Sequence, residues 1–414
     1  MKKLIFGYGA TGKSVEAYFQ RNNIEYLIYD DKNINISNEV IFDKKKFDGI
    51  DEVIISPGIK PTHPLLAEIK SKELIINTDI DLFNDIYKGK IIGVTGTNGK
   101  TTFVNLLTGF LNSQNIKAIA VGNVGKSPLE IIGDDYEFVV MELSSFQLYY
   151  INNLKLFDAI LLNIYEDHLD WHSDYDDYRN SKLKIWDFIP YETFQNKEYT
   201  EGDQISTGVH YSAQNTKFTS HTHEQWEIDN LFRKAKILEI ASKLPIHEGT
   251  LYSFIKAVVD LDLNMNSIKK FLLNYKTEEH RFEFVDKFNE VTYINDSKST
   301  NFHSLSKATT KINNGILVLH GLTKNISSQD LDISKNVKTI LVPKDMEIDL
   351  SGTNAKIIKL KSIFDIEKKL MKIIKPGDTV IFSCGGASFN DFDNYEDRGN
   401  FFKSVVSNIK VKNG

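Results

Sequence analysis

The residues with the clearest chemical potential form a glycine-rich loop that leads directly into lysine and threonine. An apolar, strand-like run, Ile91–Thr95, precedes the string Gly96-Thr97-Asn98-Gly99-Lys100-Thr101-Thr102. Backbone N–H groups of such a loop cradle phosphates, the lysine reaches the β- and γ-phosphates, and the next hydroxyl ligates Mg²⁺. Val94 stands where a strict phosphate loop has glycine, so the motif is a variant. The sequence predicts ATP rather than GTP, because no guanine-specificity string of the Asn-Lys-x-Asp type is apparent.

Two metal-competent side chains follow strand-like runs beyond this loop. Glu142 closes the run that starts at Phe138, and His168 comes shortly after the run Ala159–Asn163. The carboxyl ends of parallel strands meet at the sheet edge where α/β proteins bind ligands. Each residue alone is typical of a surface loop. The pair, next to a phosphate loop, indicates a metal site.

A second glycine motif lies at the start of the chain, in Gly7-Tyr8-Gly9-Ala10-Thr11-Gly12, between a predicted strand and a predicted helix. Such glycines let a phosphate approach the helix N-terminus, and Asp30, after the next strand, is placed to hold a ribose hydroxyl. NAD or FAD is the obvious ligand. A mononucleotide or a nucleotide-sugar would bind through the same phosphate contacts at the helix N-terminus. Alternatively, the glycines form a tight strand–helix turn that binds no ligand.

Polar strings also end the strand-like runs of the last third of the chain. Lys298 and Thr300 follow one run, Lys324 follows the next, and Ser388 follows a third. Together they predict a pocket for an acidic substrate, with the two lysines as counter-charges. Cys384 has no basic partner in its motif, so we expect a buried cysteine rather than a nucleophile.

The elements that must position these groups alternate between short apolar strands and helical stretches, which predicts right-handed βαβ units. We expect an α/β fold of three domains, each with a mainly parallel sheet flanked by helices. The expected ranges are 1–88 (Rossmann-like), 89–279 (P-loop ATPase-like) and 280–414 (Rossmann-like). Further helices are predicted at Asp176–Phe188, Ile228–Lys243 and Gly249–Leu261, and the polar stretch Pro190–Glu227 is predicted as loops and short antiparallel strands.

The composition sets outer limits on these interpretations. The chain has 414 residues, of which 41% are hydrophobic and 26% charged, with a net charge of −6. This excludes a disordered chain and a global basic surface for nucleic acid. The single cysteine excludes an intrachain disulfide. The first apolar run ends at Gly7, and no run approaches 18 apolar residues, so we expect a cytoplasmic protein without a signal peptide or membrane span.

Taken in order, these strings resemble the Mur ligase family over essentially the whole chain. The strings that carry the resemblance are Gly7–Gly12, Ser56–Ile59, Gly96–Thr102, Gly122–Gly125, Glu142–Gln147, Glu166–His168, Tyr178–Lys182, His280-Arg281, Asn295–Asn301 and Asn394–Gly399. The first, second and last of them are similar to the branch that adds D-glutamate. That branch implies ATP-dependent ligation of D-glutamate to UDP-N-acetylmuramoyl-L-alanine in cytoplasmic peptidoglycan synthesis, which serves cell wall biogenesis, cell shape and cell division.

The resemblance assigns roles to individual residues. It implies that the first glycine loop holds UDP, with the UDP-sugar bound by Ala10, Thr11, Asp30, Gly58, Asn123, Ser144 and Gln147. It implies that Arg281 and Asp296 contact ATP. It implies that D-glutamate is bound by Lys298, Thr300, Lys324, Ser388 and Tyr395.

The resemblance also implies two Mg²⁺ ions and a lysine carbamylated by CO₂. Thr101 and Glu142 would hold the first ion, whereas His168 and the Lys182 carbamate would hold the second. Lys100, His168 and Lys182 are the implied catalytic residues, and the enzyme is expected to be a monomer.

One departure from the family pattern concerns adenine. Relatives carry a His-Asn-x-x-Asn string, whereas this chain reads His247-Glu248-Gly249-Thr250-Leu251, so its adenine contacts must differ. Three alternatives stay open. They are a related ligase with another amino acid, including a folylpolyglutamate synthetase-like enzyme, a non-catalytic ATP-dependent switch, and an NAD-dependent oxidoreductase in which the phosphate loop has no role.

Overall fold

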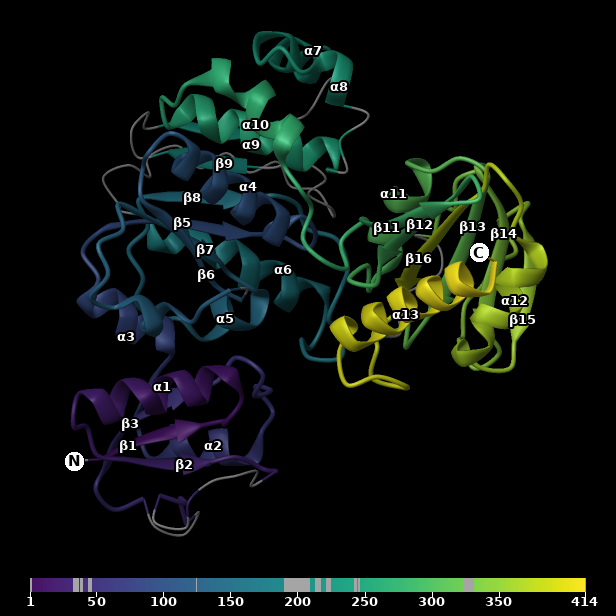
Figure 1. Cartoon of the computed structure of the whole chain (residues 1–414). Helices are drawn as coiled ribbons and strands as arrows, with labels where there is room; N and C mark the ends of the chain where they lie inside the picture. The colour runs from purple at the N-terminus through teal and green to yellow at the C-terminus, as the bar shows by residue number, and fades with distance from the viewer. Residues whose placement is uncertain are drawn as a thin grey trace. The chain divides into compact units, whose positions relative to one another are not determined.

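The structure is a computed structural model that describes residues 2–32, 37, 40–43, 47–123, 125–189, 209–212, 217–220, 225–241, 244, 246–323 and 331–413. The strands of these described residues form three sheets (Figure 1). The chain divides into two compact units. The first comprises Met1–Ile164, Trp171–Leu244 and Glu248–Asn274, and the second comprises Tyr165–Asp170, Pro245–His247 and Tyr275–Gly414. The predicted α/β fold with mainly parallel sheets is confirmed, and the exact domain boundaries stay a prediction.

The first sheet is parallel throughout. In spatial order its strands are β2 (Tyr26–Tyr29), β1 (Lys2–Phe6), β3 (Ile50–Ile55) and β4 (Ile75–Asn77). Its helices are α1 (Ala10–Arg21), α2 (Pro64–Ser71) and α3 (Asp79–Ile86). Successive strand residues serve opposite faces: Ile5 packs in one apolar cluster with Phe19 of α1, whereas Leu4 packs in another with Leu66 of α2. Coverage of both faces explains the continuous apolar runs Leu4–Phe6 in β1 and Val53–Ile55 in β3.

The second sheet carries the phosphate loop. In spatial order its strands are β10 (Lys217–Ser220), β9 (Val209–Ser212), β8 (Asp158–Leu161), β5 (Lys90–Thr95), β7 (Phe138–Glu142) and β6 (Ala118–Gly122). The last four are parallel, and β9 and β10 add an antiparallel edge. The accompanying helices are α4 (Lys100–Ser113), α5 (Ser145–Tyr150), α6 (Tyr175–Leu183), α7 (Gln225–Lys234), α8 (Leu238–Ala241), α9 (Glu248–Asp260) and α10 (Ile268–Asn274).

Hydrogen bonds join the first sheet region to the second within the first unit. The Asp81 carboxylate, in α3, accepts the N–H groups of Asn152 and Asn153 at 2.9 and 2.6 Å. The Tyr150 hydroxyl donates to the Ile59 carbonyl at 2.8 Å. These contacts place the loop after β3 next to the end of α5.

The third sheet forms the core of the second unit. In spatial order its strands are β11 (Glu283–Phe288), β12 (Val291–Asp296), β16 (Thr379–Gly385), β13 (Gly315–His320), β14 (Val337–Pro343) and β15 (Lys356–Leu360). All pairs are parallel except β11 with β12. Helices α12 (Ile366–Ile373) and α13 (Tyr395–Asn413) pack in the apolar cluster of one face, and α11 (Phe302–Thr310) packs in that of the other. Figure 1 shows α13 crossing its face of the sheet.

Several predicted elements differ in detail from the structure. The helix predicted at Ile228–Lys243 is interrupted, because Lys236 adopts a left-handed conformation with φ of 59° between α7 and α8. The helix predicted at Asp176–Phe188 ends as α6 at Leu183 and continues as a 3₁₀ helix, Lys184–Phe188. The antiparallel strands predicted in Pro190–Glu227 are present as β9 and β10. The rest of that stretch up to residue 224 lies outside the described residues. In the described part of the chain, no helix combines the length and the apolar character needed to cross a bilayer.

Candidate active site

The phosphate loop lies between β5 and α4 and is held in shape by Asn163, two residues after β8. The Thr97 N–H donates to the Asn163 carbonyl at 2.9 Å. The Asn163 side chain accepts the Asn98 N–H at 2.9 Å and donates to the Asn98 carbonyl at 3.0 Å. Lys100 Nζ folds back onto the loop, with bonds of 2.7 Å to the Gly96 carbonyl and 2.9 Å to that of Thr97. A loop fixed in this way at a helix N-terminus is suited to hold phosphate groups.

Helix α6 brings two side chains onto the same loop. Tyr178 and Lys182 are four residues apart and therefore share one helix face. The Tyr178 hydroxyl lies 2.7 Å from Thr97 Oγ1, and Lys182 Nζ donates to the Gly96 carbonyl at 2.9 Å. Lys182 is buried, and its Nζ lies 4.8 Å from the centre of the Tyr178 ring. The geometry thus places a lysine from a distant part of the sequence directly at the phosphate loop.

The Glu142 carboxylate, at the end of β7, connects the phosphate loop with the end of β6. One oxygen accepts the Thr101 hydroxyl at 2.8 Å, and the other accepts the Asn123 side-chain amide at 2.9 Å. Glu142 is buried, so its orientation is fixed by these two bonds. A carboxylate and a hydroxyl are hard oxygen donors of the kind that Mg²⁺ selects, so Glu142 and Thr101 fit that ion.

Helices α5 and α6 are held together by a buried histidine. His172 Nε2 lies 3.0 Å from Ser145 Oγ, and its Nδ1 lies 3.1 Å from the Asp177 carboxylate. Ser145 begins α5 and Asp177 lies in the first turn of α6, so the histidine fixes one helix against the other. Because α6 carries Tyr178 and Lys182, the contact also positions those two side chains.

The glycine turn of the first sheet is closed by short contacts. The Ser56 hydroxyl donates to the Gly7 carbonyl at 2.8 Å, and a Cβ on Gly12 would lie 2.1 Å from that carbonyl oxygen, so only glycine fits there. The Asp30 carboxylate accepts the N–H groups of Tyr8 and Lys32 at 2.7 and 2.8 Å. Ala10 and Thr11 form the first turn of α1, where a phosphate would meet free N–H groups.

The end of β12 carries the buried carboxylate of Asp296. Its oxygens accept the Phe282 N–H at 3.0 Å and the Ser383 hydroxyl at 2.7 Å. Burial raises the pKa of Asp296 to about 6, although the two hydrogen bonds and the nearby Arg281 oppose the shift. Lys298 follows on the same loop, and its Nζ lies 3.5 Å from the centre of the Tyr395 ring.

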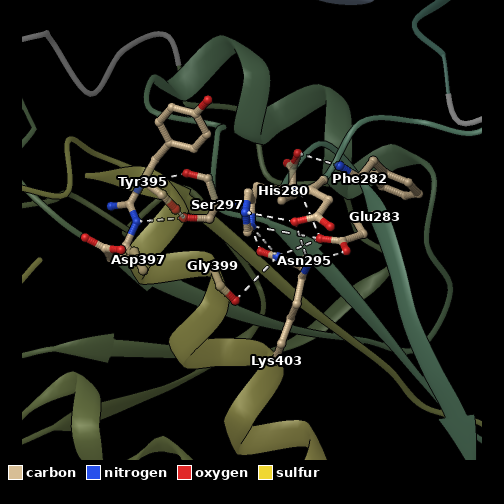
Figure 2. A network of polar contacts seen from close by, with 12 residues as sticks. His280, Phe282, Glu283, Asn295, Ser297, Tyr395, Asp397, Gly399 and Lys403 are labelled. Atoms are coloured by element: carbon tan, nitrogen blue, oxygen red, sulfur yellow. Dashed lines mark hydrogen bonds and ion pairs between the residues drawn. The ribbon is translucent and has the colours of Figure 1, made fainter. Parts of the chain in front are cut away.

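A polar network around His280 and Asn295 (Figure 2) is bonded to this loop. The Asn295 amide nitrogen lies 2.9 Å from His280 Nδ1 and donates to the Glu283 carboxylate at 2.9 Å. His280 is buried, and its carbonyl accepts the Lys298 N–H at 3.0 Å. Burial lowers the pKa of His280, with Lys403 acting in the same direction. The network therefore joins the turn before Arg281 to the loop that carries Lys298.

Comparisons with known proteins show which family the chain is similar to. Residues 94–245 match the family described as Mur ligase middle domain. A UDP-N-acetylmuramoylalanine–D-glutamate ligase of Francisella philomiragia is 31% identical, with 99% of this chain and 97% of that protein covered. The ligase of the same name from Aquifex aeolicus is 30% identical, with 98% of each chain covered. The chain belongs to the Mur ligase family.

Solved Mur ligase structures share the fold at low sequence identity. A UDP-N-acetylmuramate-alanine ligase of Thermotoga maritima has a TM-score of 0.51 at 15% identity, with 99% of this chain and 100% of that chain covered. A pseudomurein peptide ligase of Methanothermus fervidus has a TM-score of 0.53 at 14% identity, with 99% of each chain covered. These two structures support the architecture alone.

Within this Mur ligase, the structure gathers only part of the predicted site. The loop Gly96–Thr102, Asn123, Glu142 and Lys182 lie together at the carboxyl edge of the second sheet. His168 belongs to the second compact unit, so its metal role stays a prediction. Lys324 lies outside the described residues.

Two predicted UDP-sugar residues, Ser144 and Gln147, form the N-terminal cap of α5. The Gln147 side-chain oxygen accepts the Ser144 N–H at 2.9 Å, and Ser144 Oγ accepts the Gln147 N–H at 3.2 Å. Gly58 lies in the turn after β3, whereas Thr300 and Ser388 lie on loops at the end of β12 and β16.

Sequence reasoning missed several residues that shape the site. Asn163 and Tyr178 hold the phosphate loop, and His172 holds α6, yet the sequence motifs assign no role to any of the three. A usable signal existed for Tyr178, since its spacing of four residues from Lys182 places both on one helix face. Arg398, which is fully buried next to the predicted D-glutamate loops, was missed as well.

Proposed function

We propose that this Mur ligase joins D-glutamate to UDP-N-acetylmuramoyl-L-alanine at the expense of ATP. The observation that carries the proposal is the match over nearly the whole chain, at about 30% identity, to ligases named for this reaction. The phosphate loop supplies the groups for phosphoryl transfer. Lys100 and Lys182 bond to its Gly96 carbonyl, and Glu142 bonds to its Thr101 hydroxyl. The reaction belongs to peptidoglycan precursor synthesis, and we assign the enzyme to the cytoplasm as a monomer.

The first step is activation of a carboxylate. A carboxylate oxygen of the L-alanyl residue attacks the γ-phosphorus of ATP, the bond to the bridging oxygen breaks, and ADP leaves. Lys100 and the N–H groups of the loop stabilise the transferring charge, which is mainly a matter of position and electrostatics. Asn163 and Tyr178 contribute by keeping the loop in one shape, since a misplaced loop would lose that stabilisation.

The second step forms the amide. The neutral amine of D-glutamate attacks the carbonyl carbon of the acyl phosphate, and the tetrahedral intermediate collapses with loss of inorganic phosphate. The amine first loses a proton, for which His168 or water is the acceptor. Exclusion of water protects the acyl phosphate from hydrolysis until the amine arrives.

Magnesium and a carbamate complete the proposed site. Thr101 and Glu142 would hold one Mg²⁺, and His168 with a carbamate on Lys182 would hold a second. The ions neutralise phosphate charge and act as Lewis acids when bound. Carbamylation would convert the Lys182 ammonium into an anionic oxygen ligand. Arg281 and Asp296 are assigned to ATP, and Lys298, Thr300, Lys324, Ser388 and Tyr395 to D-glutamate.

The proposal is tested by phosphate release from ATP and Mg²⁺ in the presence of UDP-N-acetylmuramoyl-L-alanine, before and after D-glutamate is added. We expect release to require both substrates and the product to gain one glutamyl residue by mass spectrometry. Parallel reactions with L-alanine, diaminopimelate and glutamylated folate identify a related ligase. Phosphate release that does not depend on any of the amino acids tested would contradict the ligase activity and favour an ATP-dependent switch.

A further inference from the structure

We infer that Arg398, in the first turns of α13, is a positioning residue for D-glutamate. Its guanidinium ties together three loops that follow three different strands of the third sheet, and the predicted D-glutamate ligands lie on or next to those loops. The inference rests on the proposed function, and it assigns to Arg398 no contact with the substrate.

The guanidinium is wholly buried and donates to all three loops. Nε and Nη2 donate to the hydroxyl and the carbonyl of Ser297, after β12, at 3.0 and 2.7 Å. Nη1 donates to the carbonyl of His320, which ends β13, at 3.2 Å. It also donates to the carbonyl of Gly386, after β16, at 2.9 Å. A planar fork of fixed geometry therefore sets the distances between the three loops.

These loops carry the predicted ligands of the amino acid. Ser297 immediately precedes Lys298, and Gly386 lies two residues before Ser388. The Ser297 hydroxyl donates in turn to the carbonyl of Tyr395 at 2.8 Å, so a third predicted ligand joins the same network (Figure 2). A displacement of the guanidinium would shift the backbone that carries Lys298, Ser388 and Tyr395. It would leave the phosphate loop, which lies in the other compact unit, unchanged.

The charge of Arg398 gives it a second effect. Arginine stays protonated in proteins, and among the described residues the hydrogen-bond partners of this one are hydroxyl, carbonyl and imidazole groups. The imidazole is that of His320, whose pKa is lowered by burial, with Arg398 adding to the effect. The carboxylate of this network, Asp391, lies on the far ring nitrogen of His320 at 2.9 Å. A buried cation without a directly bonded carboxylate attracts a dicarboxylate such as D-glutamate.

The test compares KM values for the three substrates in the full-length enzyme. Arg398→Met removes the fork and the charge, Arg398→Lys keeps only the charge, and Lys410→Met removes an exposed charge from the same helix as a control. We expect Arg398→Met to raise the KM for D-glutamate by about 10- to 100-fold, as loss of an outer supporting contact typically does. The KM values for ATP and for the UDP-sugar should change far less. Arg398→Lys should fall between wild type and Arg398→Met, and Lys410→Met should match wild type.

A purely structural role would give a different pattern. It would lower the melting temperature and kcat without a selective change in the KM for D-glutamate, and this result would overturn the inference. If Arg398→Met does not fold, Arg398→Lys and Ser297→Ala decide the question by the same comparison. A wild-type enzyme without D-glutamate-dependent phosphate release would refute the proposed function and, with it, the inference. An active wild type whose variants keep the KM for D-glutamate would refute the inference alone.

Discussion

Lys100 and Lys182 donate to the same carbonyl oxygen, that of Gly96, at 2.7 and 2.9 Å. One lysine belongs to the phosphate loop and the other to α6, more than eighty residues later in the chain. Two ammonium groups on one acceptor repel each other. Conversion of Lys182 to a carbamate would replace this repulsion by attraction, and it is thus an electrostatically favourable modification of the pair.

The first prediction concerns that modification. Lys182→Arg keeps the positive charge but cannot form the carbamate, so we expect phosphate release to fall by about 100- to 1,000-fold. The wild type, incubated with carbon-13 bicarbonate, should show a carbamate signal by NMR that the variant lacks. Near-normal activity of Lys182→Arg would contradict a catalytic carbamate.

The second prediction concerns the Glu142 carboxylate. Glu142→Gln keeps the size of the side chain but removes the charge between Thr101 and Asn123. We expect kcat/KM to fall about 100-fold or more, and the Mg²⁺ concentration for half-maximal rate to rise. The exposed Glu137, changed to Gln, serves as the control and should behave as wild type. An unchanged Mg²⁺ titration would exclude Glu142 from the metal site.

The third prediction separates the hydroxyl of Tyr178 from its ring. Tyr178→Phe loses the bond to Thr97 Oγ1 but keeps the ring next to Lys182, whereas Tyr178→Leu loses both. A buried hydroxyl left without its partner costs about 1–3 kcal/mol, so Tyr178→Phe should raise the KM for ATP several-fold. Tyr178→Leu should in addition reduce kcat, because Lys182 loses its packing. Equal KM values for ATP in all three proteins would show that the hydroxyl does not shape the loop.

The fourth prediction concerns the pH dependence of stability. Asp79 is buried at the start of α3, and burial raises its pKa to about 7, although backbone hydrogen bonds oppose the shift. The folded chain therefore keeps a proton that the unfolded chain releases near pH 3.8. As pH rises through this window, the contribution of Asp79 to the free energy of unfolding decreases.

Asp79→Asn removes this dependence. The melting temperature of the variant relative to wild type should be higher at about pH 8 than at about pH 5. Asp79→Ala also loses the hydrogen bonds to the backbone at the helix N-terminus. It should therefore be less stable than Asp79→Asn at both pH values, while its melting temperature relative to wild type should also be higher at about pH 8 than at about pH 5. If the difference in melting temperature between Asp79→Asn and wild type does not change with pH, this result would contradict a protonated, buried Asp79 carboxyl.

The fifth prediction concerns the space next to His280. A Cβ on Gly399 would lie 2.1 Å from His280 Nδ1, so Gly399→Ala must displace the ring and break its contact with Asn295. We expect the free energy of unfolding, measured in urea, to fall by about 1–3 kcal/mol. Gly352→Ala is the matched control, since no atom of the described residues beyond its two chain neighbours lies within 4 Å of the added carbon. Equal stability of the two variants would show that the network is not rigid.

The sequence alone was enough to predict the phosphate loop and the parallel strands other than β15, because both depend on local patterns. Strands covered on both faces are continuous apolar runs, as in Ile316–Leu319. The edge strands β11 and β15 were not predicted. Charged residues interrupt Glu283–Phe288 and Lys356–Leu360, since an edge strand has one solvent-exposed side.

The supporting contacts were beyond prediction for a different reason. Asn163 meets Asn98 across 65 residues, and Arg398 meets Ser297 across 101. No periodicity or propensity records which loops a fold brings together. The family resemblance named the groups that touch substrate, whereas the side chains that hold those groups in place became visible only in three dimensions.

The single cysteine has a practical consequence. Cys384 lies in the core between the third sheet and α13, and burial raises the pKa of its thiol to about 11. Reagents that require an accessible thiolate should leave it untouched while the protein is folded. One cysteine introduced at exposed Glu137 and another at exposed Gly352 would then be the only labelled positions, one in each compact unit. A pair of fluorophores there would report the distance between the units as each substrate is added.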